Sequence, residues 1–179
     1  MEKPPPFGGL ATFPRFMENR TAGGFLILRT SFRNLAGKDE TLTTDFKDAH
    51  DRHWEDAESL FRDSRWANAD HLYGLAAECG LKALMRCFGM GFDTVRDRPS
   101  QTDDRVHADK AWTRYESYRS GHPSGVRYCL PPVNPFSNWS ADQRYWHRNG
   151  FTKCQTEEHR KGAELVRDLL NKAFLEGLI

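Results

Sequence analysis

The chain has 179 residues, of which 38% are hydrophobic and 28% charged, and its formal net charge is +1. This composition excludes a disordered chain, and the length fits one domain with an extension. The near-zero charge excludes a protein that is basic overall, so any nucleic-acid site must be a local patch. The start, MEKPPPFGGL, lacks the apolar segment of a secretory signal, and no stretch approaches the ~20 apolar residues of a membrane helix. We therefore expect a cytoplasmic protein that does not cross a membrane.

Prolines and glycines interrupt residues 1–43 at short intervals, which predicts an irregular N-terminal arm. The arm also contains an apolar run, Phe25–Leu28. This run is either a short strand or a segment that lies over the domain or over a partner subunit. The alternative is a poorly ordered leader, and both interpretations stay open at this point.

Two long helices are expected next. Thr43 or Thr44 is a candidate N-cap for a first helix over about 45–63, because a threonine side chain can accept a hydrogen bond from the first turn. The second helix covers 65–88, where glycines follow and end it. Because the connection between them is so short, we expect the two helices to pack antiparallel.

The second half of the chain alternates helices with irregular connections. A third helix is expected over about 104–119, followed by a long connection over 120–139. The sequence SADQ then matches a capping box and predicts a short helix over about 141–147. A last helix begins after Thr156 as its N-cap. The predicted fold class is therefore all-α, an up-and-down bundle of four to five helices over residues 44–179.

The second helix combines a seam of small residues with a polar edge. Ala69, Ala76 and Ala83 recur at helical spacing and indicate close packing against neighbours. Glu78 and Lys82 lie beside this seam, four residues apart with the acid first, which is the order that stabilises a helix. We expect a structural ion pair between them. The alternative is that Glu78 orients an arginine of the basic cluster near residue 144.

Metal-ligand patterns are weak in this sequence. The chain has four cysteines, Cys79, Cys87, Cys129 and Cys154. None of them forms a CxxC pair, which speaks against a zinc ribbon or a redox site. His50 and His53 form an HxxH pair, but no further ligand follows at a supporting spacing. We expect these histidines to be hydrogen-bonded inside the bundle, and we predict neither a metal nor another cofactor.

The segment from Asn68 to Leu84 resembles the second helix of HEPN domains, which commonly reads Gly-Tyr-Ala-x-Glu-Cys-x-Leu-Lys-Ala. The matching positions are Tyr73, Gly74, Ala76, Glu78, Cys79, Leu81, Lys82 and Ala83. Trp139 followed by Arg144-Tyr145 is similar to a short element of members that are associated with nucleotidyltransferases. The resemblance covers residues 45–175.

The resemblance implies a small all-α domain that forms a homodimer in a prokaryotic toxin–antitoxin or phage-defence system. It also implies metal-independent RNA cleavage, because many members are RNases with an arginine followed four to six residues later by a histidine. Here no histidine stands at that spacing from Arg144 or Arg148. His147 instead lies between these two arginines.

The cluster after residue 140 nevertheless contains the right residue types. Metal-independent RNA cleavage requires a base near the 2′-hydroxyl and a cation for the charge that develops on the phosphate. Arg144, His147 and Arg148 are therefore the candidate catalytic residues, and on one helix they would share a face. The alternative is that the arginines pair with acidic residues inside the bundle. The expected phosphate- or nucleic-acid-binding set is Arg144, Tyr145, Arg148, Asn149 and Lys153, supported by Glu78 and Lys82.

The residues support two functions. The first is a dimeric HEPN-like protein that binds RNA and, in its enzymatic form, cleaves it without a metal. The second is a non-catalytic HEPN-like module that binds a nucleotide or a partner protein such as a nucleotidyltransferase. The match in the second helix favours the first function, whereas the missing histidine favours the second.

Overall fold

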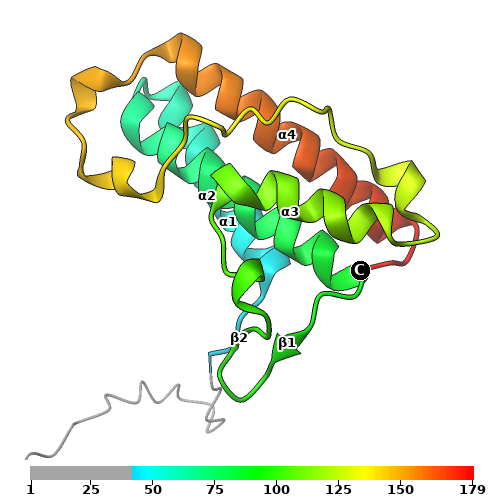
Figure 1. Cartoon of the computed structure of the whole chain (residues 1–179). Coiled ribbons are helices and arrows are strands. Elements are labelled where there is room, and N and C mark those ends of the chain that lie inside the picture. Colours follow the sequence, from blue (N-terminus) through cyan, green and yellow to red (C-terminus); the bar gives the residue numbers. More distant parts are fainter. Residues whose placement is uncertain (1–41) are drawn as a thin grey trace, which may run out of the picture. The chain divides into compact units, whose positions relative to one another are not determined.

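A computed structural model describes residues 42–179 (Figure 1), so the expected arm over 1–43, with its Phe25–Leu28 run, lies almost wholly outside the described residues. The all-α class is confirmed for this part of the chain. The α-helices are α1 (Phe46–Arg62), α2 (Trp66–Cys87), α3 (Ala108–Ser120) and α4 (Lys153–Leu175). Two short antiparallel strands, β1 (Phe92–Asp93) and β2 (Arg98–Pro99), follow α2. Four 3-10 helices complete the list: η1 (Thr102–Asp104), η2 (Gly125–Tyr128), η3 (Ala141–Tyr145) and η4 (Arg148–Gly150).

Helix α2 is the centre of the bundle and is buried on most of its circumference. Its alanines and glycines make this possible, because small side chains let neighbouring elements approach closely. A Cβ atom on Gly80 would lie only 2.5 Å from the Val166 side chain of α4. The seam predicted from the alanines is confirmed, since Ala69, Ala76 and Ala83 are all buried.

The first two helices form the predicted antiparallel pair. Ser64 lies between them with a φ of 59°, a left-handed conformation that reverses the chain in a short turn. His50, early in α1, contacts the carbonyl oxygen of Ala76 in α2 at 2.8 Å. Glu58, late in α1, accepts a hydrogen bond of 2.7 Å from the hydroxyl of Tyr73, earlier in α2.

The up-and-down order predicted for the whole bundle is wrong. Asp70 and Gly80 of α2 contact His159 and Val166 of α4 in that order, so α2 and α4 run in the same direction. Figure 1 shows that α3 also follows the direction of α2. The long connections over 88–107 and 121–152 carry the chain back each time, whereas an up-and-down bundle needs only short loops.

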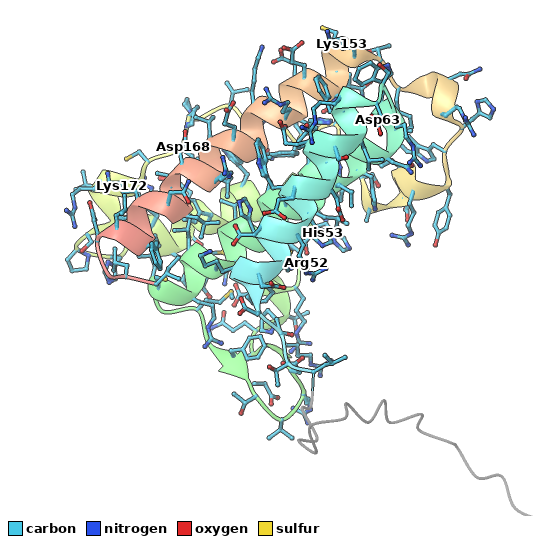
Figure 2. All side chains as sticks on the ribbon, turned by 180° about the vertical axis from the view of Figure 1, so that it is seen from behind. Arg52, His53, Asp63, Lys153, Asp168 and Lys172 are labelled. Carbon is cyan, nitrogen blue, oxygen red and sulfur yellow. The ribbon has the colours of Figure 1, made fainter. Side chains whose placement is uncertain are left out.

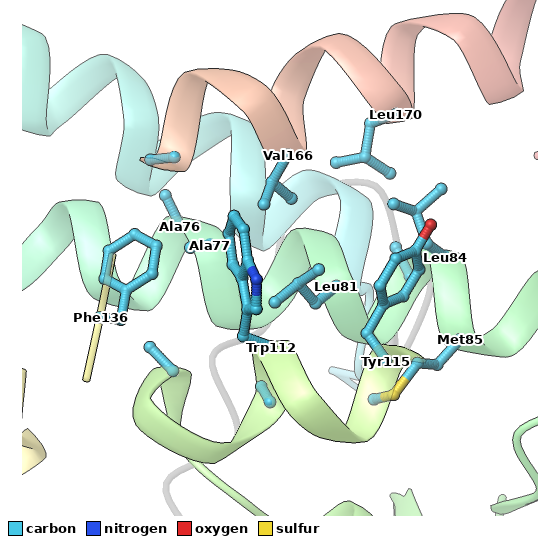
Figure 3. Packing of buried hydrophobic residues seen from close by; sticks show 14 of the residues in the cluster. Ala76, Ala77, Leu81, Leu84, Met85, Trp112, Tyr115, Phe136, Val166 and Leu170 are labelled. Carbon is cyan, nitrogen blue, oxygen red and sulfur yellow. The ribbon is translucent and has the colours of Figure 1, made fainter. Parts of the chain in front are cut away.

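The core lies where α2, α3 and α4 meet, and Figure 3 shows its side chains. Large side chains from α3 and α4 fill the space that the small residues of α2 leave open. The buried residues labelled there are Ala76, Ala77, Leu81, Leu84, Met85, Trp112, Tyr115, Phe136, Val166 and Leu170.

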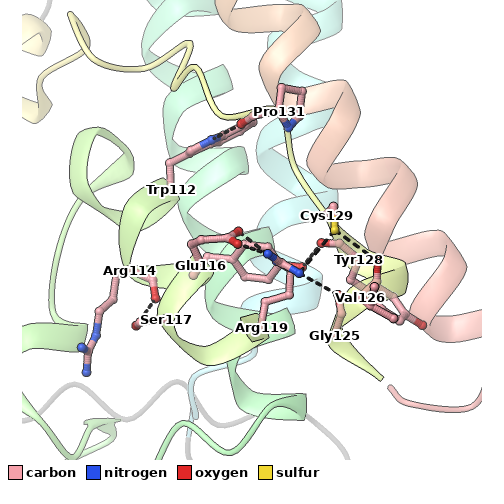
Figure 4. Close-up of polar contacts among 11 residues, drawn as sticks. Trp112, Arg114, Glu116, Ser117, Arg119, Gly125, Val126, Tyr128, Cys129 and Pro131 are labelled. Atoms are coloured by element: carbon pink, nitrogen blue, oxygen red, sulfur yellow. Dashed lines mark hydrogen bonds and ion pairs between the residues drawn. The ribbon is translucent and has the colours of Figure 1, made fainter. Parts of the chain in front are cut away.

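Polar contacts fix the connection that follows α3 (Figure 4). The Arg119 guanidinium donates to the Glu116 carboxylate and to the carbonyl oxygen of Gly125. The Trp112 indole N–H donates to the carbonyl oxygen of Pro131 at 3.2 Å. These bonds hold the irregular connection against α3 and thereby direct the chain toward η3.

Helix α1 also packs against α4, as the view from behind shows (Figure 2). Arg160 of α4 makes two hydrogen bonds to the Glu58 carboxylate, at 2.6 and 3.1 Å. The predicted start of α4 is wrong, because Thr152 is the N-cap and accepts from the backbone N–H of Gln155. Thr156 lies one turn inside the helix and donates its hydroxyl to the carbonyl oxygen of Thr152.

Candidate functional site

The segment after Ser140 consists of two short 3-10 turns, not of one helix over 141–147. The predicted capping box is confirmed, with Ser140 and Gln143 bonding each other's backbone. The chain then becomes extended at Trp146 and His147, with ψ angles of 154° and 135°. The expectation that the candidate catalytic residues share one helix face is therefore wrong, because this extended pair separates η3 from η4.

A buried polar network anchors this segment to the bundle. The Asp70 carboxylate in α2 accepts from the side-chain amide of Gln143 at 2.7 Å and contacts Nδ1 of His159 at 2.7 Å. The other ring nitrogen of His159 lies 2.9 Å from the Asn138 side-chain oxygen. Asp70 and His159 are almost completely buried. Sequence analysis did not identify this network, although an aspartate on an otherwise apolar helix face is a signal for one.

Trp139 fixes the same segment from the apolar side. Its indole N–H donates to the backbone oxygen of Asp70 at 3.2 Å, and its ring occupies the place where a side chain at position 74 would lie. A Cβ atom on Gly74 would be 2.0 Å from the ring. The ring also stacks on His71, with centroids 5.5 Å apart and planes at 13°. The glycine of the family-like segment thus has a direct structural role here.

Two neighbouring cavities lie where this segment meets the first turns of α2. The first, named the Arg148 cavity, has a volume of about 390 Å³. Its lining includes two arginines, Arg65 and Arg148, and the amide of Asn149, and Arg65 was not predicted. As N-cap residue of α2, Arg65 makes no side-chain hydrogen bond to the first turn within the described residues. The lining consists of Ser64, Arg65, Trp66, Ala67, Asn68, Arg148, Asn149 and Phe151.

The second cavity, named the His71 cavity, has a volume of about 280 Å³. Arg144 and His71 both line it, so the structure brings a cation and an imidazole together, but the histidine comes from α2. Burial lowers the pKa of His71, and the positive charge of Arg144 lowers it further. The lining consists of Leu60, Ala67, Asn68, His71, Leu72, Gln143, Arg144 and Trp146.

The remaining predicted residues lie outside these two cavities. His147 is exposed, and its Nδ1 accepts from the backbone N–H of Asn149 at 3.3 Å. Tyr145 is 76% exposed and lies under the Arg144 guanidinium, 4.5 Å from the ring centroid. Lys153 is exposed on the first turn of α4. The candidate catalytic set is therefore divided, because Arg144 and Arg148 line different cavities and His147 lines neither.

The Glu78–Lys82 ion pair is confirmed, with Nζ of Lys82 2.7 Å from the carboxylate. The second carboxylate oxygen of Glu78 lies 3.0 Å from Nδ1 of His107. The alternative role for Glu78, orienting an arginine of the basic cluster, is wrong. Lys82 and His107 occupy its oxygens, and Arg144 bonds the carbonyl oxygen of Ala141 at 2.9 Å.

Other expected features concern metals and membranes. Between residues 42 and 179, no group of three or more histidine, cysteine or acidic residues is arranged to hold a metal ion. His50 is buried and hydrogen-bonded inside the bundle, as predicted. Within the same range, no helix combines the length and the apolar character that a membrane span requires.

Comparisons with known proteins do not add a relative. No protein-family model, no curated protein and no solved structure matches this chain significantly. The resemblance to HEPN domains therefore stays a prediction that depends on the residues of α2 and of the segment around Trp139.

Proposed function

We propose that the protein is a HEPN-like, dimeric cytoplasmic protein of a prokaryotic defence or toxin–antitoxin system that binds RNA through a basic surface. We define this surface by Arg65, Arg144, Arg148 and Asn149. One observation carries the proposal: three arginines line two adjoining cavities, and neither lining includes a carboxylate.

Arginine side chains suit phosphate for a physical reason. The guanidinium group presents N–H donors in a planar fork that matches two phosphate oxygens, and charge-assisted bonds of this kind are stronger than neutral ones. Arg148 lines its cavity together with the first turn of α2, where backbone N–H groups have no partner inside the helix. These donors and the arginine side chain suit the same anion.

Aromatic side chains beside the arginines favour a nucleic acid over a free anion. Tyr145 and Trp146 are 76% and 56% exposed, and Trp146 lines the His71 cavity. Exposed aromatic rings next to cations provide stacking surfaces for unpaired bases. A single-stranded segment of RNA therefore suits this surface better than a duplex does.

Binding of labelled single-stranded RNA tests the proposal. We expect Arg148→Ala to weaken binding about tenfold or more, as for loss of a hydrogen bond to a charged group. The slope of log affinity against log salt concentration should become shallower by about 0.7 for the lost phosphate contact. Arg52→Ala is the matched control. Arg52 is an exposed arginine of α1, paired with Asp48 at 2.9 Å, and lies about 15 Å before the end of the helix. Equal affinities of both variants and wild type would refute the basic surface.

Binding of RNA does not imply cleavage of RNA, because His147 lines neither of the cavities that the arginines line. This separation favours the second candidate, a non-catalytic module that binds a nucleotide or a partner protein such as a nucleotidyltransferase. Incubation of RNA with the protein and a metal chelator distinguishes the two. Cleavage by wild type that is lost in Arg148→Ala supports the enzyme, whereas intact RNA with retained binding supports the module.

A further inference from the structure

We propose that the His71 cavity is a pocket for a nucleobase, in which Trp146 stacks on the base, Asn68 and His71 contact its polar edge, and Arg144 holds the attached phosphate. This inference rests on the proposed function and specifies it, because it assigns the base of the bound nucleotide to one cavity.

The composition of the cavity fits a flat, partly polar ligand. One part of the lining is apolar and comes from Leu60, Ala67 and Leu72, and the Trp146 indole adds a flat surface. The polar part comes from α2 and η3. Its volume of about 280 Å³ lies just below the ~300–1,000 Å³ of small-molecule sites, so it suits one small ligand such as a single nucleotide.

One ring nitrogen of His71 lacks a hydrogen-bond partner among the described residues. Its ring is stacked on Trp139, which is itself fixed by the bond to the backbone of Asp70. Nδ1 of His71 and Nε2 of His50 are buried side-chain nitrogens without a hydrogen-bond partner among residues 42–179, and of the two residues His71 lines the cavity. Buried polar atoms without a partner are uncommon, and a group supplied from outside the chain is one explanation.

The charge state of His71 also suits a base. Its charged neighbours are Arg144, Asp70, His53 and Glu78, and burial together with Arg144 dominates, so that the pKa of His71 is lowered. The imidazole is then neutral near pH 7, with one nitrogen that donates and one that accepts. A neutral imidazole can pair with a base edge, whereas a protonated one loses its acceptor.

The two cavities adjoin, which allows one strand to occupy both. Ala67 and Asn68 of the first turn of α2 line the Arg148 cavity as well as the His71 cavity. A base in the His71 cavity therefore leaves the neighbouring phosphate of the same strand beside Arg148. Asn68 lies at the boundary and is exposed, so its side-chain amide can reach the base.

Calorimetric titration tests the pocket with the four 5′-mononucleotides and with ribose 5-phosphate, which has the phosphate but no base. We expect the best nucleotide to bind at least about tenfold more tightly than ribose 5-phosphate, as for one stacked base. Trp146→Ala should reduce this nucleotide-to-ribose-phosphate affinity ratio to near one. Phe174→Ala is the control, since Phe174 is an exposed aromatic residue of α4 that does not line the cavity.

A second measurement determines how the affinity ratio between the nucleotide and ribose 5-phosphate changes with pH. Lowering the pH from about 7.5 should reduce the nucleotide-to-ribose-phosphate affinity ratio as His71 becomes protonated, and because its pKa is lowered the fall should begin below about pH 6.5. The two ligands share the same titrating phosphate, so the ratio isolates the base. His71→Gln keeps a donor and an acceptor without titrating, and its ratio should not change with pH.

The outcomes separate the pocket from the proposed function. Equal binding of ribose 5-phosphate and nucleotides would overturn the base pocket and leave phosphate binding intact. The same holds if single-stranded RNA binds but no mononucleotide does. Failure of RNA, nucleotides and ribose 5-phosphate to bind would overturn both.

Discussion

Gln143 and Arg144 are neighbours in the chain but belong to two different polar regions. The Gln143 side chain is buried and donates to Asp70, in a network that includes His159 and Asn138. The Arg144 side chain, 47% exposed, has local partners in residues 141, 142 and 145. The first region stabilises the fold, whereas the second leaves its arginine side chains accessible to a ligand.

Burial explains this division of roles. A buried hydrogen bond is costly to break, because the partner that remains is left without water. An exposed ion pair contributes little to folding, because water replaces the lost partner. Changes in the Asp70 network should therefore alter stability, and changes in the basic surface should alter binding alone.

The largest loss of stability is expected for Asp70→Ala. The substitution leaves the buried ring of His159 and the amide of Gln143 without their shared acceptor. We expect the free energy of unfolding to fall by about 3–5 kcal/mol, as for removal of one partner of a buried pair. Urea denaturation measures this change. Asp142→Ala is the control, because Asp142 is a highly exposed acid of the same segment, and a comparable loss there would contradict the division.

Gly74→Ala should have the second largest effect. Alanine is favoured over glycine in a helix by about 1 kcal/mol, but the added Cβ atom would overlap the Trp139 ring, 2.0 Å away. We expect a net destabilisation of about 1–3 kcal/mol, typical of overpacking. Gly150→Ala provides the comparison, since its Cβ would meet nothing within 4 Å. If both variants unfold at the same urea concentration, close packing of Trp139 on Gly74 does not stabilise the fold.

Acid should weaken the bundle. Burial lowers the pKa of His50, His53 and His71 in the folded chain, whereas the unfolded chain takes up protons near pH 6.5. The unfolded state then binds more protons, so stability is lost as the pH falls below about 6.5. We expect the urea midpoint to be lower at about pH 5.5 than at about pH 7.5.

A variant identifies the source of this acid sensitivity. His50→Asn keeps a donor toward the carbonyl oxygen of Ala76 but cannot be protonated. Its loss of stability between the two pH values should be smaller than that of wild type. An unchanged loss would assign the sensitivity to other groups.

The smallest effect on stability is expected for Arg144→Ala and Arg148→Ala. Both side chains are exposed, and surface substitutions usually change stability by less than about 0.5 kcal/mol. Their urea midpoints should match wild type while their affinity for RNA falls. A large loss of stability would mean that these arginines belong to the fold.

Local patterns predicted much of the fold. The extents of α1 and α2, their antiparallel packing and the Glu78–Lys82 pair follow from spacings of a few residues. The predicted N-cap of α1, Thr43 or Thr44, is wrong, because the Asp45 side chain caps the helix. The network around Asp70 was missed, because its bonds join residues 73 and 89 positions apart. The direction of α3 and α4 was missed for the same reason, since long irregular connections leave the return path open.

The site was predicted in part. Arg144, Arg148 and Asn149 do line cavities, but the histidine beside Arg144 in the His71 cavity is His71, which no motif near residue 144 could indicate. Arg65 was missed because its role depends on the fold of the turn before α2. The sequence around residue 144 identified the arginines, whereas the residues of α2 that line the same cavities became evident only from the tertiary structure.

The shared direction of α2 and α4 has an electrostatic consequence. Aligned peptide dipoles give each helix a charge of roughly +0.5 at its N-terminus and −0.5 at its C-terminus. Both helices begin beside the Arg148 cavity, one at Trp66 and the other soon after Phe151, whereas only α1 ends there. The backbone alone thus contributes a net field of positive sign at this end of the bundle. In an up-and-down order, neighbouring dipoles would largely cancel.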